Sequence, residues 1–325
     1  MRKLLLSTTA LAAAATLSAN AALADVAISG AFEWTYNSRS SNVTALDGTT
    51  FGTDSEMAIN FTNKTDSGLD ITYRVDFHTD GGAFANDETS LAIAGGFGKV
   101  VLGYDDEAGD AYIIDESDLI KEDTAVPISS ATISTGTSAP GDSDGNKVAY
   151  HLPAMGGLTA GISHTDGGEE GGNDTTSMGA NYAMEAAGAS ITVGITSTTT
   201  ENTTQDIDQE QMGLKIVSGD ISVILATGQY EANDEERDNS GAAISYSMPN
   251  GMTIGAYTAK SEDDSDAGEE YTRTGVEVVY PIAAGLTAMI NVDDYEYKLG
   301  TDADSTGANQ SDSGTNSKLT IQATF

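Results

Sequence analysis

The chain has 325 residues, with 50 acidic side chains against 14 basic ones and a formal net charge of −36. This charge argues against nucleic acid as a partner, because phosphate binding needs a face rich in lysine and arginine. The absence of cysteine excludes disulfides, thiolate metal sites and a cysteine nucleophile. An acidic chain rich in Gly, Ser and Thr could be disordered, but the order of its apolar residues argues otherwise.

The first segment has the pattern of a secretory signal peptide. Arg2 and Lys3 precede an uncharged stretch rich in alanine and leucine, and Ala22-Leu23-Ala24 gives the small-x-small pattern of a cleavage site. We therefore expect export, with residues 1–24 removed and 25–325 forming a single domain. An uncleaved membrane anchor is the alternative, but this run is short for a span, which needs roughly 20 apolar residues.

Apolar and polar residues alternate along the remaining chain. From Leu69 to His78 every odd position is apolar and every even position is polar, and the two ends of the mature chain repeat the pattern. Such alternation is typical of strands with one apolar face and one wet face. Sixteen such segments are predicted, at 26–38, 54–64, 69–79, 87–95, 98–105, 146–153, 157–165, 175–184, 189–199, 207–217, 221–231, 239–248, 251–261, 269–280, 284–296 and 315–325.

The connections between these segments alternate in length. Short ones containing glycine, as tight hairpins require, lie at 65–68, 96–98, 153–156, 185–188, 218–220, 249–251 and 281–285. Longer, mostly acidic ones lie at 39–53, 80–86, 106–145, 166–174, 200–206, 232–238, 262–268 and 297–314. This sorting predicts an all-β fold, a 16-stranded antiparallel transmembrane β-barrel with short periplasmic turns and long extracellular loops. The polar second face predicts a water-filled interior.

Three segments resemble general bacterial porins of the α-proteobacterial type, such as those of Rhodobacter. Residues 65–69, Thr-Asp-Ser-Gly-Leu, resemble the T-x-S-G-L segment of that family, and residues 95–103 resemble its G-x-F-G-K/R-x-x-x-G segment. The final strand ends in Phe325, which resembles the aromatic signal of barrel insertion. The resemblance implies a trimeric diffusion pore whose third long loop folds inward as a constriction. Residues 106–145 occupy that place here.

Acids dominate this predicted constriction loop, which contains ten acids and one base, Lys121. Its apolar runs 111–114 and 119–120 are expected to pack against the barrel wall. A structureless loop of this length is unusual in a compact domain unless it has a function. We assign to the pore constriction the loop acids Asp106, Asp110, Asp115, Glu116, Asp118 and Glu122.

Few bases are available to face these acids. By alternation, the basic residues expected to point inward are Lys64, Arg74, Lys99, Lys147, Lys215, Arg273 and Lys318. Arg74 is the preferred candidate for the wall opposite the loop, with His78 and Lys318 as lesser ones. Acids facing bases would create a transverse field that favours small polar solutes, and the excess of acids predicts cation preference. For any single acid, a place on the outer surface remains the alternative.

No cofactor is expected. Residues 142–146 and 262–266 have the spacing of calcium-loop fragments, but neither completes the twelve-residue loop with its final glutamate. Weak, non-specific binding of a divalent cation such as Ca²⁺, bridging acidic loops to lipopolysaccharide phosphates, is the expectation. His78, His151 and His164 fall on three different strands, so a zinc site is not predicted. His78 and His151 are expected to face inward, and His164 outward.

The predicted function is a passive channel for ions and small hydrophilic solutes across the Gram-negative outer membrane. An enzyme is not predicted, since no serine lies in a G-x-S-x-G context. Expected partners are outer-membrane lipid, lipopolysaccharide and, from the resemblance, two further copies of the chain. A solute-specific channel is the main alternative. A secreted adhesin or β-solenoid is another, although a solenoid would show a fixed repeat.

Overall fold

The computed structural model describes residues 25–43, 46–78, 85–121, 145–167, 173–201, 206–232, 235–263, 268–298 and 311–325. The predicted signal peptide, at 1–24, and loop residues 122–144, including Glu122, lie outside this range. Within it the strands are β1 (Asp25–Ser41), β2 (Gly48–Lys64), β3 (Asp70–His78), β4 (Ala85–Gly95), β5 (Gly98–Asp105), β6 (Gly145–His151), β7 (Leu158–Thr165), β8 (Asp174–Ala186), β9 (Ala189–Glu201), β10 (Asp206–Ser218), β11 (Ile221–Ala232), β12 (Glu235–Ser247), β13 (Thr253–Asp263), β14 (Glu269–Ala283), β15 (Leu286–Lys298) and β16 (Asp312–Thr324).

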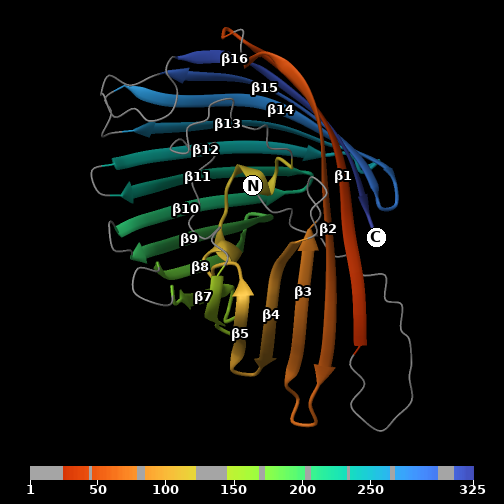
Figure 1. The fold of residues 1–325 in the computed structure, drawn as a ribbon, viewed down its shortest axis with the longest axis vertical. Coiled ribbons are helices and arrows are strands. Elements are labelled where there is room, and N and C mark those ends of the chain that lie inside the picture. Colours follow the sequence, from red (N-terminus) through yellow and green to blue (C-terminus); the bar gives the residue numbers. More distant parts are fainter. Residues whose placement is uncertain are drawn as a thin grey trace.

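These strands form one closed barrel (Figure 1). Each strand pairs antiparallel with its neighbours in sequence, and β1 closes the barrel by pairing with β16. At the closure, Gly30 and Phe325 exchange backbone hydrogen bonds of 3.2 and 2.9 Å. The predicted fold class, a 16-stranded antiparallel barrel, is therefore confirmed.

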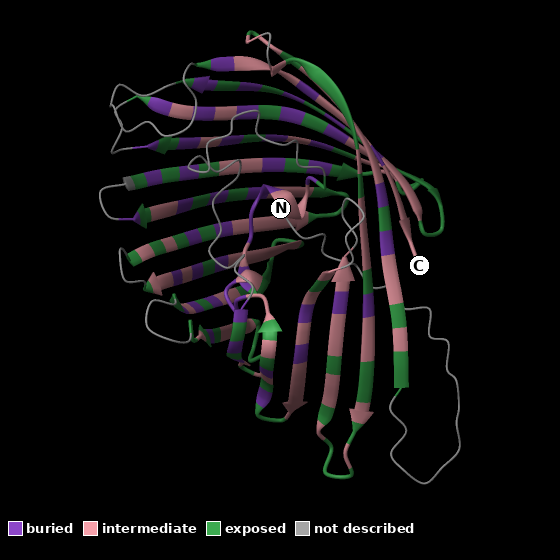
Figure 2. Cartoon of the chain, viewed as in Figure 1, coloured by how far each residue is buried: buried purple, intermediate pink, exposed green. Residues whose placement is uncertain are grey.

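Exposure alternates along the strands because successive side chains point to opposite faces (Figure 2). On β13, Tyr257 and Ala259 point inward and are buried, whereas the intervening Thr258 is exposed. Large apolar side chains on the outer face are half-exposed, for example Ile195 at 55% and Leu225 at 51%. A single-layer barrel leaves such a belt for lipid to cover.

Two predicted long loops are mostly strand, so those predictions were wrong. The predicted loop 39–53 is largely the ends of β1 and β2, and the predicted loop 232–238 lies largely in β11 and β12. Beyond the apolar belt an outward-facing residue no longer needs an apolar side chain. The alternation that marks a strand in the sequence therefore disappears there while the backbone pairing continues.

Two short 3-10 helices follow β5 inside the barrel, η3 (Asp110–Tyr112) and η4 (Glu116–Asp118). In the described part of the chain, no helix has the length and apolar character needed to cross a membrane.

Candidate pore constriction

The chain turns into the barrel directly after β5 and runs along the inner wall as residues 106–121, called here the loop segment (Figure 1). The Ala108 N–H donates to Ser163 Oγ of β7 at 2.9 Å. Further on, Gln211 of β10 donates to the Ile114 carbonyl at 2.9 Å, and the Lys121 N–H donates to Glu277 of β14 at 2.9 Å. The loop segment thus crosses the inner face of the strands from β6 to β14.

A row of inward-facing glycines lets the loop segment lie close to the wall. A Cβ added at Gly179 would lie 2.7 Å from Tyr112, and one at Gly255 would lie 2.6 Å from Ile120. At Gly213 and Gly241 an added Cβ would collide with the Ile114 carbonyl and with the Glu116 carboxylate. We call this row the glycine track: Gly161, Gly179, Gly194, Gly213, Gly241 and Gly255.

Apolar side chains of the loop segment fill the space over the track. Tyr112, Ile114 and Ile120 are each no more than 5% exposed. The sequence-based expectation that the runs 111–114 and 119–120 pack against the wall holds for these three residues. The Tyr112 hydroxyl also lies 2.8 Å from His151 Nδ1, and burial raises the pKa of Tyr112.

Removing that hydroxyl tests the contact. We expect Tyr112→Phe to lower the free energy of unfolding by about 1 kcal/mol, because one partly buried hydrogen bond is lost while the ring stays packed. Urea unfolding of the folded barrel, followed by tryptophan fluorescence, measures the change. Tyr246→Phe on the exposed outer face is the control. An equal loss in both variants would contradict the prediction.

A fully buried ion pair anchors the start of the loop segment. Lys147 Nζ of β6 lies 3.3 Å from Glu107 Oε1, and neither side chain has any exposed surface. Ser163 and Thr165 of β7 donate hydrogen bonds of 2.8 and 3.2 Å to the same carboxylate. Alternation in the sequence placed Lys147 on the inner face, but nothing in the sequence paired it with Glu107.

Three of the predicted constriction acids are turned toward the wall. Asp115 is 2% exposed and accepts a 2.9 Å bond from the Ser117 N–H, so it caps η4. Glu116 is 1% exposed and lies against Gly241. Asp118 lies 3.5 Å from Lys215 of β10. Burial raises the pKa of Asp118, and the nearby Lys215 opposes this rise.

The other two described loop acids, Asp106 and Asp110, are partly exposed. Asp106 begins the loop segment beside β5, and its N–H is bonded to Asp105 Oδ1 at 3.0 Å. Asp110 opens η3. Together with Asp118, whose side chain is 25% exposed, these two are the described members of the predicted loop set that retain surface.

The loop segment meets β4 and β5 at its start, where Ala108 packs with Val101 and Ala92. The arc of wall from β15 through β16 and β1 to β3 lies beyond the strands named in these contacts, and we call it the uncovered arc. Arg74, the preferred base, lies here on β3 and is ion-paired with Asp76 and, at 3.5 Å, with Glu88. His78 lies 3.7 Å from Asp87. Lys318 of β16 is half-buried and lies opposite Asn37 and Asn291 in register.

Acids outnumber bases on the inner wall formed by β1 to β5. Glu33 lies opposite Asp54 in register, and Glu56 lies opposite His78. Four carboxylates, those of Asp54, Asp87, Asp76 and Glu33, act electrostatically on Glu56. The inward-facing acids of β1 to β5 include Asp25, Glu33, Asp54, Glu56, Asp70, Asp76, Glu88 and Asp105.

Strand register places all seven predicted inward-facing bases on the inner face. His151 also faces inward, toward Tyr112, and His164 is exposed on the outer face. Two further inward bases escaped the sequence analysis, Arg39 and Arg237. Both lie in stretches predicted as loops, where no face was assigned, although each belongs to an extended strand end.

One acidic group could hold a cation. Carboxylate oxygens of Glu88, Asp105 and Asp106 lie within 4.8 Å of one another, a set that suits a hard ion such as Ca²⁺. Arg74 already lies 3.5 Å from Glu88 and offsets part of this charge. Of the two calcium-loop fragments, residues 142–144 and 264–266 lie outside the described range.

The barrel, its inward-folded segment and its charged interior agree with a match to a known family. Residues 7–316 match the family described as Gram-negative porin. The chain belongs to the Gram-negative porins. By family and fold, this porin is a channel of the outer membrane, as the sequence predicted.

Solved structures similar to this porin share its fold. An anion-selective porin from Comamonas acidovorans has a TM-score of 0.66 at 16% identity, covering 93% of this chain and 100% of that one. OmpT of Vibrio cholerae, in a trimer form, has a TM-score of 0.69 at 14% identity, and the match covers 93% of this chain and 100% of that one. OmpF of Salmonella typhi in complex with daunomycin has a TM-score of 0.68 at 12% identity, and the match covers 93% of this chain and 98% of that one. No curated protein matches the chain.

Proposed function

We propose that this porin is a passive, cation-preferring channel for ions and small hydrophilic solutes, and that it is not an enzyme. The observation that carries the proposal is the acidic wall formed by β1 to β5. Asp54 and Glu56 on that wall are partly exposed and inward-facing. The mid-strand base Arg74 is held between Asp76 and Glu88, so its charge is offset locally.

The charges of the loop segment contribute less than the sequence suggested. Glu107 is paired with Lys147, and Asp118 with Lys215. A negative wall in a narrow, low-dielectric passage raises the local concentration of cations and repels anions. Selectivity is therefore argued from this chain's own charges. The Comamonas porin, named as anion-selective, is only 16% identical and supports the fold alone.

Reversal potentials in a planar bilayer test the proposal. Under a salt gradient, we expect the wild-type channel to give a cation-selective potential, and Asp54→Asn/Glu56→Gln to move that potential toward zero. The control is Asp238→Asn/Glu262→Gln, which removes the same charges from the outer face. A non-selective or anion-selective wild type would contradict the proposed function. If the wild type is cation-selective but the double variant has the same reversal potential, the selectivity does not depend on the β1–β5 wall.

We further propose a homotrimer of the α-proteobacterial type, exported by a signal peptide at residues 1–24. The T-x-S-G-L and G-x-F-G-K segments support the subfamily, and they form the β2–β3 and β4–β5 hairpins. The trimer form of OmpT, similar in fold, supports the oligomeric state. Lipopolysaccharide and weakly bound divalent cations are the proposed partners, without a resident cofactor. Chemical crosslinking in detergent, followed by SDS gels, tests the trimer.

A further inference from the structure

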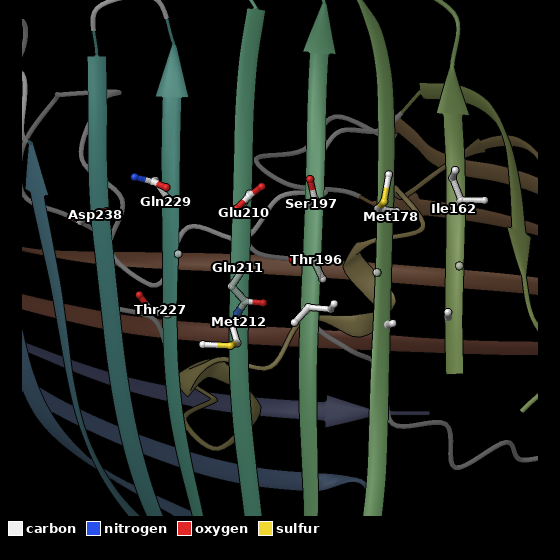
Figure 3. A pocket seen from close by; sticks show the side chains of 16 residues that line it. Ile162, Met178, Thr196, Ser197, Glu210, Gln211, Met212, Thr227, Gln229 and Asp238 are labelled. Atoms are coloured by element: carbon white, nitrogen blue, oxygen red, sulfur yellow. The ribbon is translucent and has the colours of Figure 1, made fainter. Parts of the chain in front are cut away.

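The outer face of the barrel carries a groove that the channel does not use (Figure 3). It extends from β7 to β12 and has a volume of about 730 Å³. Small-molecule sites in proteins typically measure about 300–1,000 Å³. We call this feature the outer groove.

The outer groove is built from two neighbouring rows of residues that pair across the strands. The row nearer the extracellular ends consists of Ile162, Met178, Ser197, Glu210, Gln229 and Asp238, one from each strand. The row nearer the periplasm consists of Ala160, Ala180, Ile195, Met212 and Thr227. Strand pairing therefore fixes which side chains meet in the groove.

Small residues make the hollow. Ala160 and Ala180 face outward side by side, next to the larger Ile162 and Met178, which pair with each other in the adjoining row. The backbone of Gly161 and Gly179 also lines the groove, and on the inner side Tyr112 lies against the same two glycines. At this place a single layer of backbone separates the groove from the loop segment.

The chemistry of the groove changes along its length. At the β7–β8 side, and in the periplasmic row apart from Thr227, the lining is apolar, and Ile162, Met178, Ile195 and Met212 are 46–55% exposed. On β9 and β10, Ser197 and Glu210 lie two residues closer to the extracellular end than Ile195 and Met212. An apolar side toward the membrane interior and a polar side toward the headgroups match the two ends of a lipid.

The polar side carries negative charge. Glu210 and Asp238 are exposed and lie on either side of Gln229 in the same row. Two carboxylates repel a headgroup whose only charge is phosphate, whereas an ammonium can donate three charge-assisted hydrogen bonds. The hydroxyl of Ser197, next in the row, can donate to the phosphate.

We propose that the outer groove binds one phospholipid with a primary-amine headgroup, phosphatidylethanolamine. The acyl chain lies along Ile195 and Met212 over the alanine floor, and the ammonium lies over Gln229 between the two carboxylates. The site faces lipid and takes no part in conduction, so it is independent of the proposed function.

Native mass spectrometry of the full-length porin in detergent tests the site with defined lipids. We expect phosphatidylethanolamine to be retained roughly tenfold more tightly than phosphatidylcholine, which has the same phosphate but no N–H donor, because a hydrogen bond to a charged group contributes about that factor. Phosphatidylglycerol and lipopolysaccharide serve as anionic competitors. Equal retention of the ethanolamine and choline lipids, or preferential retention of an anionic lipid, would overturn the proposal.

Two pairs of variants separate the groove from the rest of the belt. Ala180→Leu fills the hollow and is expected to abolish the selective retention, whereas Ala288→Leu, which faces lipid on β15, leaves it intact. Glu210→Gln/Asp238→Asn is expected to remove the preference for ethanolamine over choline. Glu262→Gln/Asp294→Asn, outward-facing on β13 and β15, keeps it. Unchanged single-channel conductance shows that each variant is folded, and retention that is unaffected by Ala180→Leu would refute the site.

Discussion

Replacement of Lys147 by methionine is expected to lower the free energy of unfolding by about 3–5 kcal/mol. The substitution leaves the Glu107 carboxylate buried without its cation, at a place where neither side chain has exposed surface. Hydroxyls of Ser163 and Thr165 still donate to Glu107, but they cannot neutralise it. Urea unfolding of the barrel in lipid vesicles measures the loss.

A double variant distinguishes the buried charge from the lost side chain. Lys147→Met/Glu107→Gln is expected to recover most of the stability, because a neutral amide can still accept from Ser163 and Thr165. Lys64→Met is the control for loss of an inward lysine, since the Lys64–Asp70 pair is well exposed, with side chains 67% and 59% accessible. Equal destabilisation by Lys147→Met and the double variant would contradict the role of the ion pair.

Gly213→Val is expected to reduce single-channel conductance. Any Cβ at this position collides with the Ile114 carbonyl, so the loop segment must move away from the wall and into the lumen. Overpacking of this kind typically costs about 1–3 kcal/mol, so we also expect a lower unfolding midpoint. Planar-bilayer recordings measure the first effect and thermal denaturation the second.

Gly48→Val is the matched control. Gly48 also faces inward on a strand, opposite Arg39, but no atom lies within 4 Å of an added Cβ. We expect its conductance to stay at the wild-type level. If Gly213→Val conducts as well as Gly48→Val, the glycine track does not position the loop segment.

Most of the fold could be predicted because successive residues of a barrel strand face lipid and lumen in turn, so apolar and polar residues alternate in the sequence. From Leu69 to His78 that pattern has no exception, and β3 spans Asp70–His78. The alternation disappears where both faces of a strand are polar, as in residues 236–238 near the start of β12. Strand ends beyond the lipid are therefore mistaken for loops, and Arg39 and Arg237 were missed with them.

The site was less predictable because it depends on which strands of the barrel wall the loop segment contacts. Counting acids identified an acidic loop, but it could not show that Asp115 caps its own helix or that Glu116 faces Gly241. The glycine track was missed for a related reason. A glycine within a strand usually suggests a bulge or a weak point. Only the structure shows that Tyr112 and Ile114 of the loop segment occupy the space that a side chain would fill at these glycines.

The thinness of the wall at Gly161 and Gly179 has a mechanical consequence. Tyr112 lies against these glycines on the inside, and the same backbone lines the outer groove. Neither glycine has a side chain on the inner face to keep Tyr112 away from the backbone, so we expect a displacement of the wall here to be passed to Tyr112. We therefore expect the thickness and tension of the surrounding membrane to influence the position of the loop segment inside the barrel.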